Sequence, residues 1–145
     1  MKILVAVDGS ETSLHAVRHA LHLKREGLRA DIVLATVQQP TFFYEMVLAP
    51  DTDVLERLSG AVGGRALAPA QALLEAAGVS CTHEIGSGEV APTLVEIAER
   101  QGCDAIVMGA RGLGAVRGAL LGSVSQGVLQ RARVPVTIVK DEAAP

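Results

Sequence analysis

Glycine, arginine and serine residues in the last third of the sequence have the types and spacing of a phosphate site. Gly109, Arg111 and Gly112 stand in one short run, and Gly122 and Ser123 follow after nine further residues. Glycines let backbone N–H groups approach phosphate oxygens, and a helix beginning near Ser123 adds its positive dipole end. Arg111 can supply a cation, while the Ser123 hydroxyl can bond a terminal phosphate or cap its own helix. The spacing favours a phosphate cradle over a flexible surface loop.

Asp8 is a second feature of the sequence that could take part in chemistry. It follows the apolar run from Ile3 to Val7 and precedes Gly9. Its carboxylate could accept a ribose hydroxyl, hold a metal-bound water, or form the turn that Gly9 continues. Ligands of an open parallel sheet bind beyond the carboxyl ends of its strands, so these roles require Asp8 and the glycine run to share one sheet edge.

Five short segments rich in valine and isoleucine are predicted to form that sheet. Their continuous apolar character is typical of parallel strands covered on both faces. The segments are Lys2 to Val7, Ala30 to Val37, Val79 to Ile85, Asp104 to Met108 and Val134 to Val139.

Helical periodicity occupies the stretches between these strands. Ser10 to Glu26 carries an apolar stripe, a capping serine and a terminal Gly27, and Glu89 to Gln101 and Ser123 to Arg131 repeat the pattern. Asp51 to Ala77 contains three glycines and Pro69, which predict two segments rather than one. The alternation predicts one α/β domain over residues 1–145: a doubly wound five-stranded parallel sheet of Rossmann-like order 3-2-1-4-5, with helices on both faces.

The gapped pattern Gly109-x-x-Gly112, nine residues, Gly122-Ser123, with Asp8 after a first strand, resembles the universal stress protein family in its nucleotide-binding form. The resemblance extends from Ile3 to Val139. It implies that ATP, with or without Mg²⁺, lies over the strand ends, and that two copies pair through the last strand.

The same resemblance implies a role for each matching residue. Asp8 would contact the ribose or adenosine side, and Val37 would pair its backbone with adenine. The phosphates would be held by Gly109, Gly112, Gly122, Ser123 and the Val124 amide. One position departs from the family pattern, since Ala110 stands where serine or threonine is frequent, and one neutral hydrogen bond of about 1 kcal/mol would be lost.

Composition and charge exclude several other classes of function. The formal charge is -3 and aromatic residues make up 2% of the chain, so neither a basic surface nor a base-stacking platform for nucleic acid is available. We expect no export signal and no membrane span, because apolar runs are interrupted well before about 20 residues. Cys81 and Cys103 lack metal-ligand spacing and are expected to be small buried residues in a reduced, cytoplasmic setting.

Competing motifs are weaker. Gly86-Ser87-Gly88 fits a loose dinucleotide fingerprint, but no acidic residue ends the following strand, so we interpret these glycines as a tight turn and cap. A phosphoacceptor domain requires acidic residues clustered at two strand ends, and this sequence does not have them. The lysine of a P-loop is also absent from the sequence. His15, His19 and His22 share a helix face that we expect to be solvated rather than metal-bound.

The predicted function is therefore adenine-nucleotide binding by a homodimeric stress-response regulator with no catalytic residue and no resident metal. Slow Mg²⁺-dependent ATP hydrolysis and a nucleotide-free dimeric scaffold are the two alternatives. Pro135, which lacks an N–H, places Val134 to Val139 at a sheet edge that could pair with a second copy. Phe42, Phe43 and Tyr44 in the Gln38 to Pro50 loop could form a lid, a contact patch or an ordinary connection.

Overall fold

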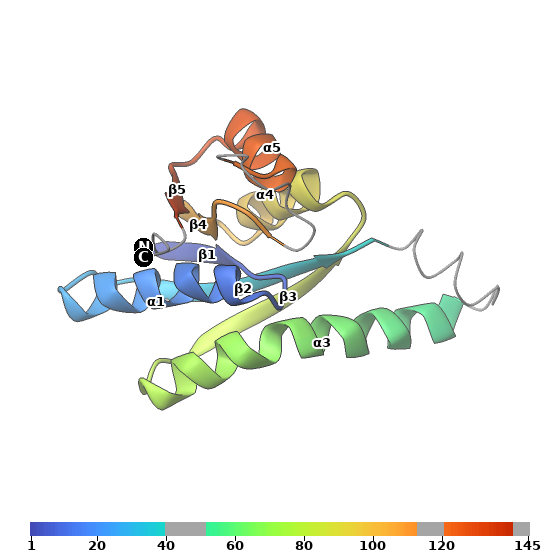
Figure 1. Cartoon of the computed structure of the whole chain (residues 1–145), viewed down its shortest axis with the longest axis horizontal. Coiled ribbons are helices and arrows are strands. Elements are labelled where there is room, and N and C mark those ends of the chain that lie inside the picture. Colours follow the sequence, from blue (N-terminus) through green and yellow to red (C-terminus); the bar gives the residue numbers. More distant parts are fainter. Residues whose placement is uncertain (40–51, 113–120, 141–145) are drawn as a thin grey trace, which may run out of the picture.

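The computed structural model describes residues 1–39, 52–112 and 121–140. Within them, five strands form one parallel sheet, and Figure 1 shows how the helices surround it. The strands are β1 (Lys2–Ala6), β2 (Asp31–Gln38), β3 (Cys81–Ser87), β4 (Ala105–Gly109) and β5 (Val136–Val139). The helices are α1 (Glu11–Arg25), α3 (Thr52–Ala76), α4 (Val90–Arg100) and α5 (Ser123–Arg131).

The strand order is β3-β2-β1-β4-β5, which confirms the predicted doubly wound topology. β1 is central and pairs with both β2 and β4, while β3 and β5 form the two edges. The order reverses at β1, because the chain moves outward first through β2 and β3 and then through β4 and β5. Doubly wound sheets bind ligands at this reversal point, beyond the carboxyl ends of the strands.

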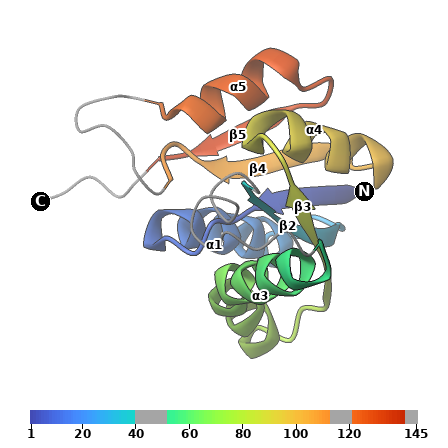
Figure 2. The same cartoon turned by 90° about the vertical axis from the view of Figure 1, so that its right-hand side faces the viewer.

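Two apolar layers hold the helices against the sheet. Figure 2 shows α1 and α3 on one face and α4 and α5 on the other. The first layer includes Val5, Val17 and Leu34, and the second includes Leu4, Ile97 and Ile106, all at most 2% exposed. Successive residues of a strand point to opposite faces, so the part of a strand that is covered on both sides must be continuously apolar, as Ile3 to Ala6 of β1 are.

The β1–α1 turn and the start of α1 follow their sequence signals. The Ser10 side chain caps the helix by accepting a hydrogen bond from the Ser13 N–H at 3.1 Å. Gly9 in the turn adopts φ +87°, and Gly27 beyond the helix adopts φ +108°. Both lie in the left-handed region that glycine enters without a Cβ clash.

The predicted break in the 51–77 segment is wrong, since α3 is one helix with Pro69 inside it. Leu67, Ala70 and Leu74 lie on its buried face and are at most 1% exposed. Burying each leucine contributes about 1.5–3 kcal/mol, which offsets the roughly 3 kcal/mol cost of an internal proline. Gly63 also has a packing role, because a Cβ there would lie 2.6 Å from Ile85 Cγ2.

The structure confirms the predicted turn at Gly88 but not at Gly86. Gly88 adopts φ +129° and forms the predicted turn into α4. Gly86 lies within β3 rather than in a turn, and a Cβ there would lie 2.6 Å from Thr93 Cγ2. A glycine is therefore needed at position 86 for α4 to pack on the sheet.

β5 lies at the sheet edge, as Pro135 predicts. The Phe42, Phe43 and Tyr44 prediction falls outside the described residues. Among the described helices, none has both the length and the apolarity that a membrane span needs.

Candidate functional site

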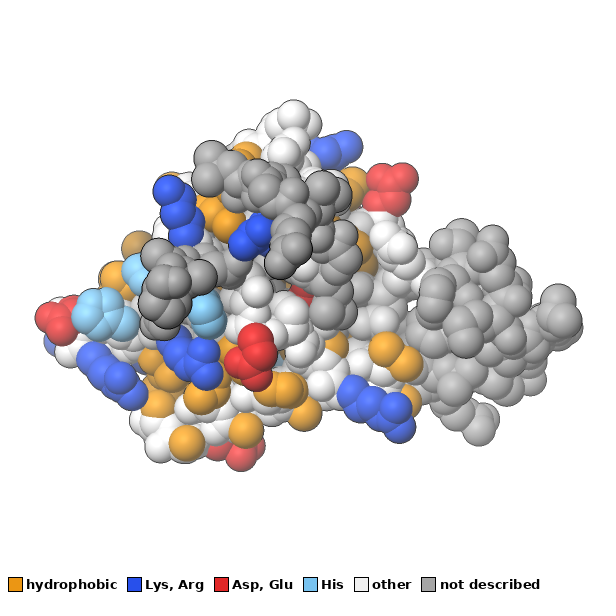
Figure 3. Space-filling model, in the orientation of Figure 1, with side chains coloured by type: hydrophobic (Ala, Val, Ile, Leu, Met, Phe, Trp, Pro, Cys, Tyr) orange, Lys and Arg blue, Asp and Glu red, His pale blue; other side chains and the backbone are white. Residues whose placement is uncertain are grey.

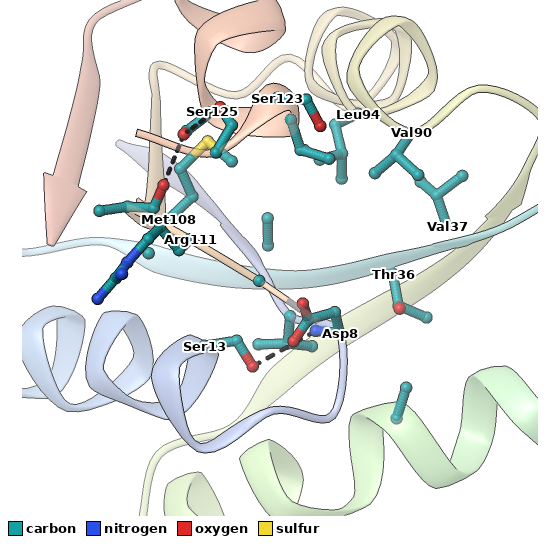
Figure 4. A pocket seen from close by; sticks show the side chains of 18 of the residues that line it. Asp8, Ser13, Thr36, Val37, Val90, Leu94, Met108, Arg111, Ser123 and Ser125 are labelled. Atoms are coloured by element: carbon teal, nitrogen blue, oxygen red, sulfur yellow. Dashed lines mark hydrogen bonds between the residues drawn. The ribbon is translucent and has the colours of Figure 1, made fainter. Parts of the chain in front are cut away.

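A pocket of about 970 Å³ opens at the carboxyl ends of β1, β2 and β4. Figure 4 shows it between the start of α1 and α3 on one side and α4 and α5 on the other. The structure brings all eight predicted site residues to its lining: Asp8, Val37, Gly109, Arg111, Gly112, Gly122, Ser123 and Val124. Residues from three strand ends and one helix start therefore share one cavity, as the doubly wound topology requires.

Asp8 lies at the base of this pocket and also shapes the turn after β1. Its Oδ1 accepts hydrogen bonds from the Ser10 backbone N–H at 2.9 Å and from the Ser10 hydroxyl. This Asx turn confirms the turn-forming role considered for Asp8. The residue lines the pocket at the same time, so the turn fixes the carboxylate in place for any ligand contact.

The glycines of the run serve different purposes. A Cβ on Gly112 would lie 2.3 Å from Asp8 Oδ2, so only glycine permits the Gly112 backbone to lie against that carboxylate. A Cβ on Gly109 would lie 3.3 Å from both Cγ2 and the carbonyl oxygen of Thr12 in α1. Gly112 therefore joins the β1 and β4 ends of the site, while Gly109 lets β4 end close to α1.

The connection from β4 to α5 is fixed through the Ala110 backbone. Its N–H donates to the Val139 carbonyl at 3.0 Å, and its carbonyl accepts from the Gly122 N–H at 2.8 Å and from the Ser125 hydroxyl at 2.7 Å. A serine or threonine side chain at position 110 is therefore not needed to fix this turn. The bonds hold the start of α5 beside the end of β4.

The N-terminus of α5 opens onto the pocket. Its N-cap residue is Gly122, which has no side chain to accept the first helical N–H groups. Ser123 is the first helical residue and does not act as the cap. Because the unpaired amides of a first helical turn carry partial positive charge, this end of α5 is suited to an anion.

The Val37 backbone faces the space beyond the carboxyl end of β1. The Val7 N–H donates to the Ala35 carbonyl at 2.9 Å, whereas the Gly88 N–H donates to the Gln38 carbonyl at 3.0 Å on the other side of β2. Backbone groups alternate between the two neighbouring strands, so Val37, like Ala35, faces the β1 side. Within the described ranges, no backbone bond continues this ladder from Val7 to Val37. The Val37 amide and carbonyl are therefore oriented to pair with a ligand edge.

Sequence reasoning missed several pocket residues. Val90 and Leu94 of α4 lie on the same side of the pocket as Val37, and Met108 of β4 lines the pocket on the side of Arg111 and Ser125 (Figure 4). Thr36 and Ser125 line the pocket as buried polar residues. Apolar residues within a helix or strand resemble any core residue in sequence, so no local signal distinguishes those that line a pocket.

The two cysteines and the histidine face lie outside this pocket. Burial raises the pKa of the Cys103 thiol, and burial followed by the nearby Glu75 charge raises that of Cys81, which disfavours the reactive thiolate at neutral pH. Figure 3 shows histidine side chains at the surface over α1. No group of three or more metal-ligating side chains occurs in the part of the chain that the structure describes.

Comparison with known proteins agrees with this architecture. The family model described as "Universal stress protein family" matches residues 1–140. The chain is also 32% identical over 139 residues to the universal stress protein MJ0531 of Methanocaldococcus jannaschii, covering 96% of this chain and 81% of that protein. The chain therefore belongs to the universal stress protein family.

Solved structures show the same fold. The hypothetical protein MJ0577 superposes with a TM-score of 0.81 at 26% identity, covering 99% of this chain and 97% of that one. A universal stress protein crystallised in complex with cAMP superposes with a TM-score of 0.69 at 30% identity, covering 96% of each chain.

Proposed function

We propose that this protein binds an adenine nucleotide, with ATP as the ligand considered first, and acts as a cytoplasmic stress-response regulator. The observation that carries the proposal is the pairing of two features in one pocket. The open N-terminus of α5 is suited to phosphate, and the inward-facing backbone of Val37 is suited to a base edge. The similar family member in complex with cAMP supports an adenine nucleotide as the ligand class.

The nucleoside half of the ligand is assigned to the β1 and β2 ends. The Val37 amide and carbonyl offer a donor and an acceptor, which together match the edge of an adenine ring. Val90 and Leu94 provide apolar surface on the same side of the pocket. Asp8 is assigned to a ribose hydroxyl, with a metal-bound water as the alternative partner of its carboxylate.

The phosphates are assigned to the β4–α5 side. Backbone groups of Gly109, Gly112 and Gly122, the Ser123 hydroxyl and the Val124 amide would hold them, and Arg111 would add positive charge. When bound with ATP, Mg²⁺ would neutralise phosphate charge next to Asp8. No residue of the described pocket is assigned as a general base, so slow hydrolysis would be incidental rather than the purpose of the site.

Calorimetric titration of the purified protein with ATP, AMP and cAMP tests this proposal, with Gly122→Val as the disruptive variant. Gly122 has φ −76° and ψ 170°, and a Cβ there meets its nearest atoms only at 3.5 Å, so the variant should fold. Its branched side chain should keep phosphates from the amides and abolish binding. Gly64→Val is the matched control, because Gly64 is an exposed position of α3 and a Cβ there has nothing within 4 Å. Parent-like binding by Gly122→Val would show that the phosphate site is misassigned, and a parent protein that binds none of the three nucleotides would favour the nucleotide-free scaffold.

We also propose a homodimer through Val134 to Val139. Among the residues that the structure describes, β5 pairs only with β4, and its other edge offers backbone groups for pairing with a second copy. Leu129 of the adjacent α5 is 43% exposed and would extend an apolar contact. Sedimentation should give twice the 15.0 kDa monomer mass, and Ile138→Lys should reduce it to the monomer. An unchanged dimer after that substitution would refute this interface.

A further inference from the structure

Three polar residues in the described part of the chain are buried: Ser13, Thr36 and Ser125. All three line the pocket. Two of them are explained by the fold. The Ser13 hydroxyl donates to the Ser10 carbonyl at 2.9 Å, and the Ser125 hydroxyl donates to the Ala110 carbonyl at 2.7 Å.

Thr36 is different. It is 2% exposed, yet its hydroxyl makes no side-chain hydrogen bond to any residue that the structure describes. It follows Ile32 and Leu34 on one face of β2, and both of those residues belong to the apolar core. A valine at this position would pack as Ile32 and Leu34 do, so packing alone does not account for the hydroxyl.

A buried hydroxyl without a partner is unfavourable, because it loses its hydrogen bonds to water and gains none from the protein. Figure 4 shows the Thr36 side chain leaving β2 toward α3, on the same side of the sheet as Asp8. The group that would satisfy the hydroxyl therefore belongs to whatever occupies the pocket.

We infer that Thr36 is a ligand-contact residue whose hydroxyl hydrogen-bonds the nucleoside half of the bound nucleotide. The inference rests on the proposed function. Thr36 directly precedes Val37, which is assigned to the base, and lies on the same side as Asp8, which is assigned to the ribose. The phosphate residues come from the β4–α5 side instead. The contact should therefore depend on the base and sugar and be independent of the number of phosphates.

Calorimetry with adenosine, AMP and ATP on three variants tests the inference. Thr36→Val keeps the shape and removes the hydroxyl, so affinity should fall about 3- to 10-fold, by the same factor for all three ligands. Thr36→Ser keeps the hydroxyl and should bind within about 2-fold of the parent. Thr82→Val, at an exposed position of β3 outside the pocket, is the matched control and should bind as the parent does.

Thermal unfolding without nucleotide separates a ligand contact from a structural role. Thr36→Val should unfold at or above the parent's temperature, because no hydrogen bond to the described protein is lost. With 2′-deoxyadenosine, a loss that disappears identifies the ribose 2′-hydroxyl as the partner, and a loss that persists assigns the contact to the base or the rest of the sugar.

Three outcomes would overturn this inference and leave the proposed function standing. They are unchanged binding by Thr36→Val, an equal loss in Thr36→Ser, or a loss that grows with phosphate number. A parent protein that binds none of the three ligands would instead refute the proposed function, and the inference with it.

Discussion

Two of the glycine-containing junctions between a strand and the following helix, at the end of β3 and after β4, differ in what lies opposite each missing side chain. At Gly86 the space is filled by Thr93 and Ile97 of α4, and neither Gly86 nor Gly88 lines the pocket. At Gly112 the space is taken by the Asp8 carboxylate, and the glycines after β4 border the pocket.

The difference shows that glycine spacing has to be interpreted together with the neighbouring elements. The β3–α4 connection uses glycine for close packing between a helix and a strand, and its glycines do not line the pocket. The β4–α5 connection uses glycine to bring backbone groups beside a carboxylate and an open helix terminus, where an anion with a polar sugar would fit. Substitutions at matched positions of the two connections should therefore affect different properties.

Among the alanine substitutions at these two junctions, the largest effect is expected from Gly112→Ala. The new Cβ would lie 2.3 Å from Asp8 Oδ2, so the carboxylate or the Gly112 backbone must move. We expect nucleotide affinity to fall about 100-fold, near the upper end of the 1–3 kcal/mol typical of overpacking. Calorimetry measures the loss, and thermal unfolding should change by only a few degrees. Parent-like affinity would show that Asp8 and Gly112 need not stay in contact for binding.

Gly86→Ala should mainly lower stability. Its Cβ would lie 2.6 Å from Thr93 Cγ2 and 3.1 Å from Ile97 Cδ1, which are side chains that pack α4 on the sheet. The expected loss is about 2 kcal/mol of unfolding free energy, measured by urea denaturation. The folded protein should still bind nucleotide within about 3-fold of the parent, since about 0.7 kcal/mol or less would be involved. A stable Gly86→Ala protein that had lost nucleotide binding would remove the distinction between the two connections.

The smallest effect is expected from Ser123→Ala. Ser123 is exposed at the first position of α5, so stability should not change. Affinity for ATP should fall by roughly 1 to 2 kcal/mol, because the neighbouring amides remain in place. Ser87→Ala, at an exposed position of the β3–α4 connection, is the control and should bind ATP as the parent does. Equal affinities for the two variants would remove the Ser123 hydroxyl from the site.

Much of the fold could be predicted because its signals are local. Strand composition, the Ser10 cap and the alternation of strands with helices determine the topology, and the topology brings Asp8, Val37 and the glycine run to one pocket. The continuity of α3 could not be predicted, because it depends on burial of Leu67 and Leu74 in a tertiary core that they share with residues of β1, β2 and α1. The contact between Gly112 and Asp8 joins residues about a hundred positions apart and has no sequence signal.

The most direct test of the account is a ¹⁵N NMR titration of the parent protein with ATP. If the nucleotide lies across the β1, β2 and β4 ends, the amides of Val37, Gly109, Gly112, Gly122 and Val124 should shift with one common dissociation constant. Those of Gly86 and Gly88 should move far less. Shifts concentrated at Gly86 and Gly88, or no saturable shift at any of the first five amides, would contradict the assignment of this pocket to an adenine nucleotide.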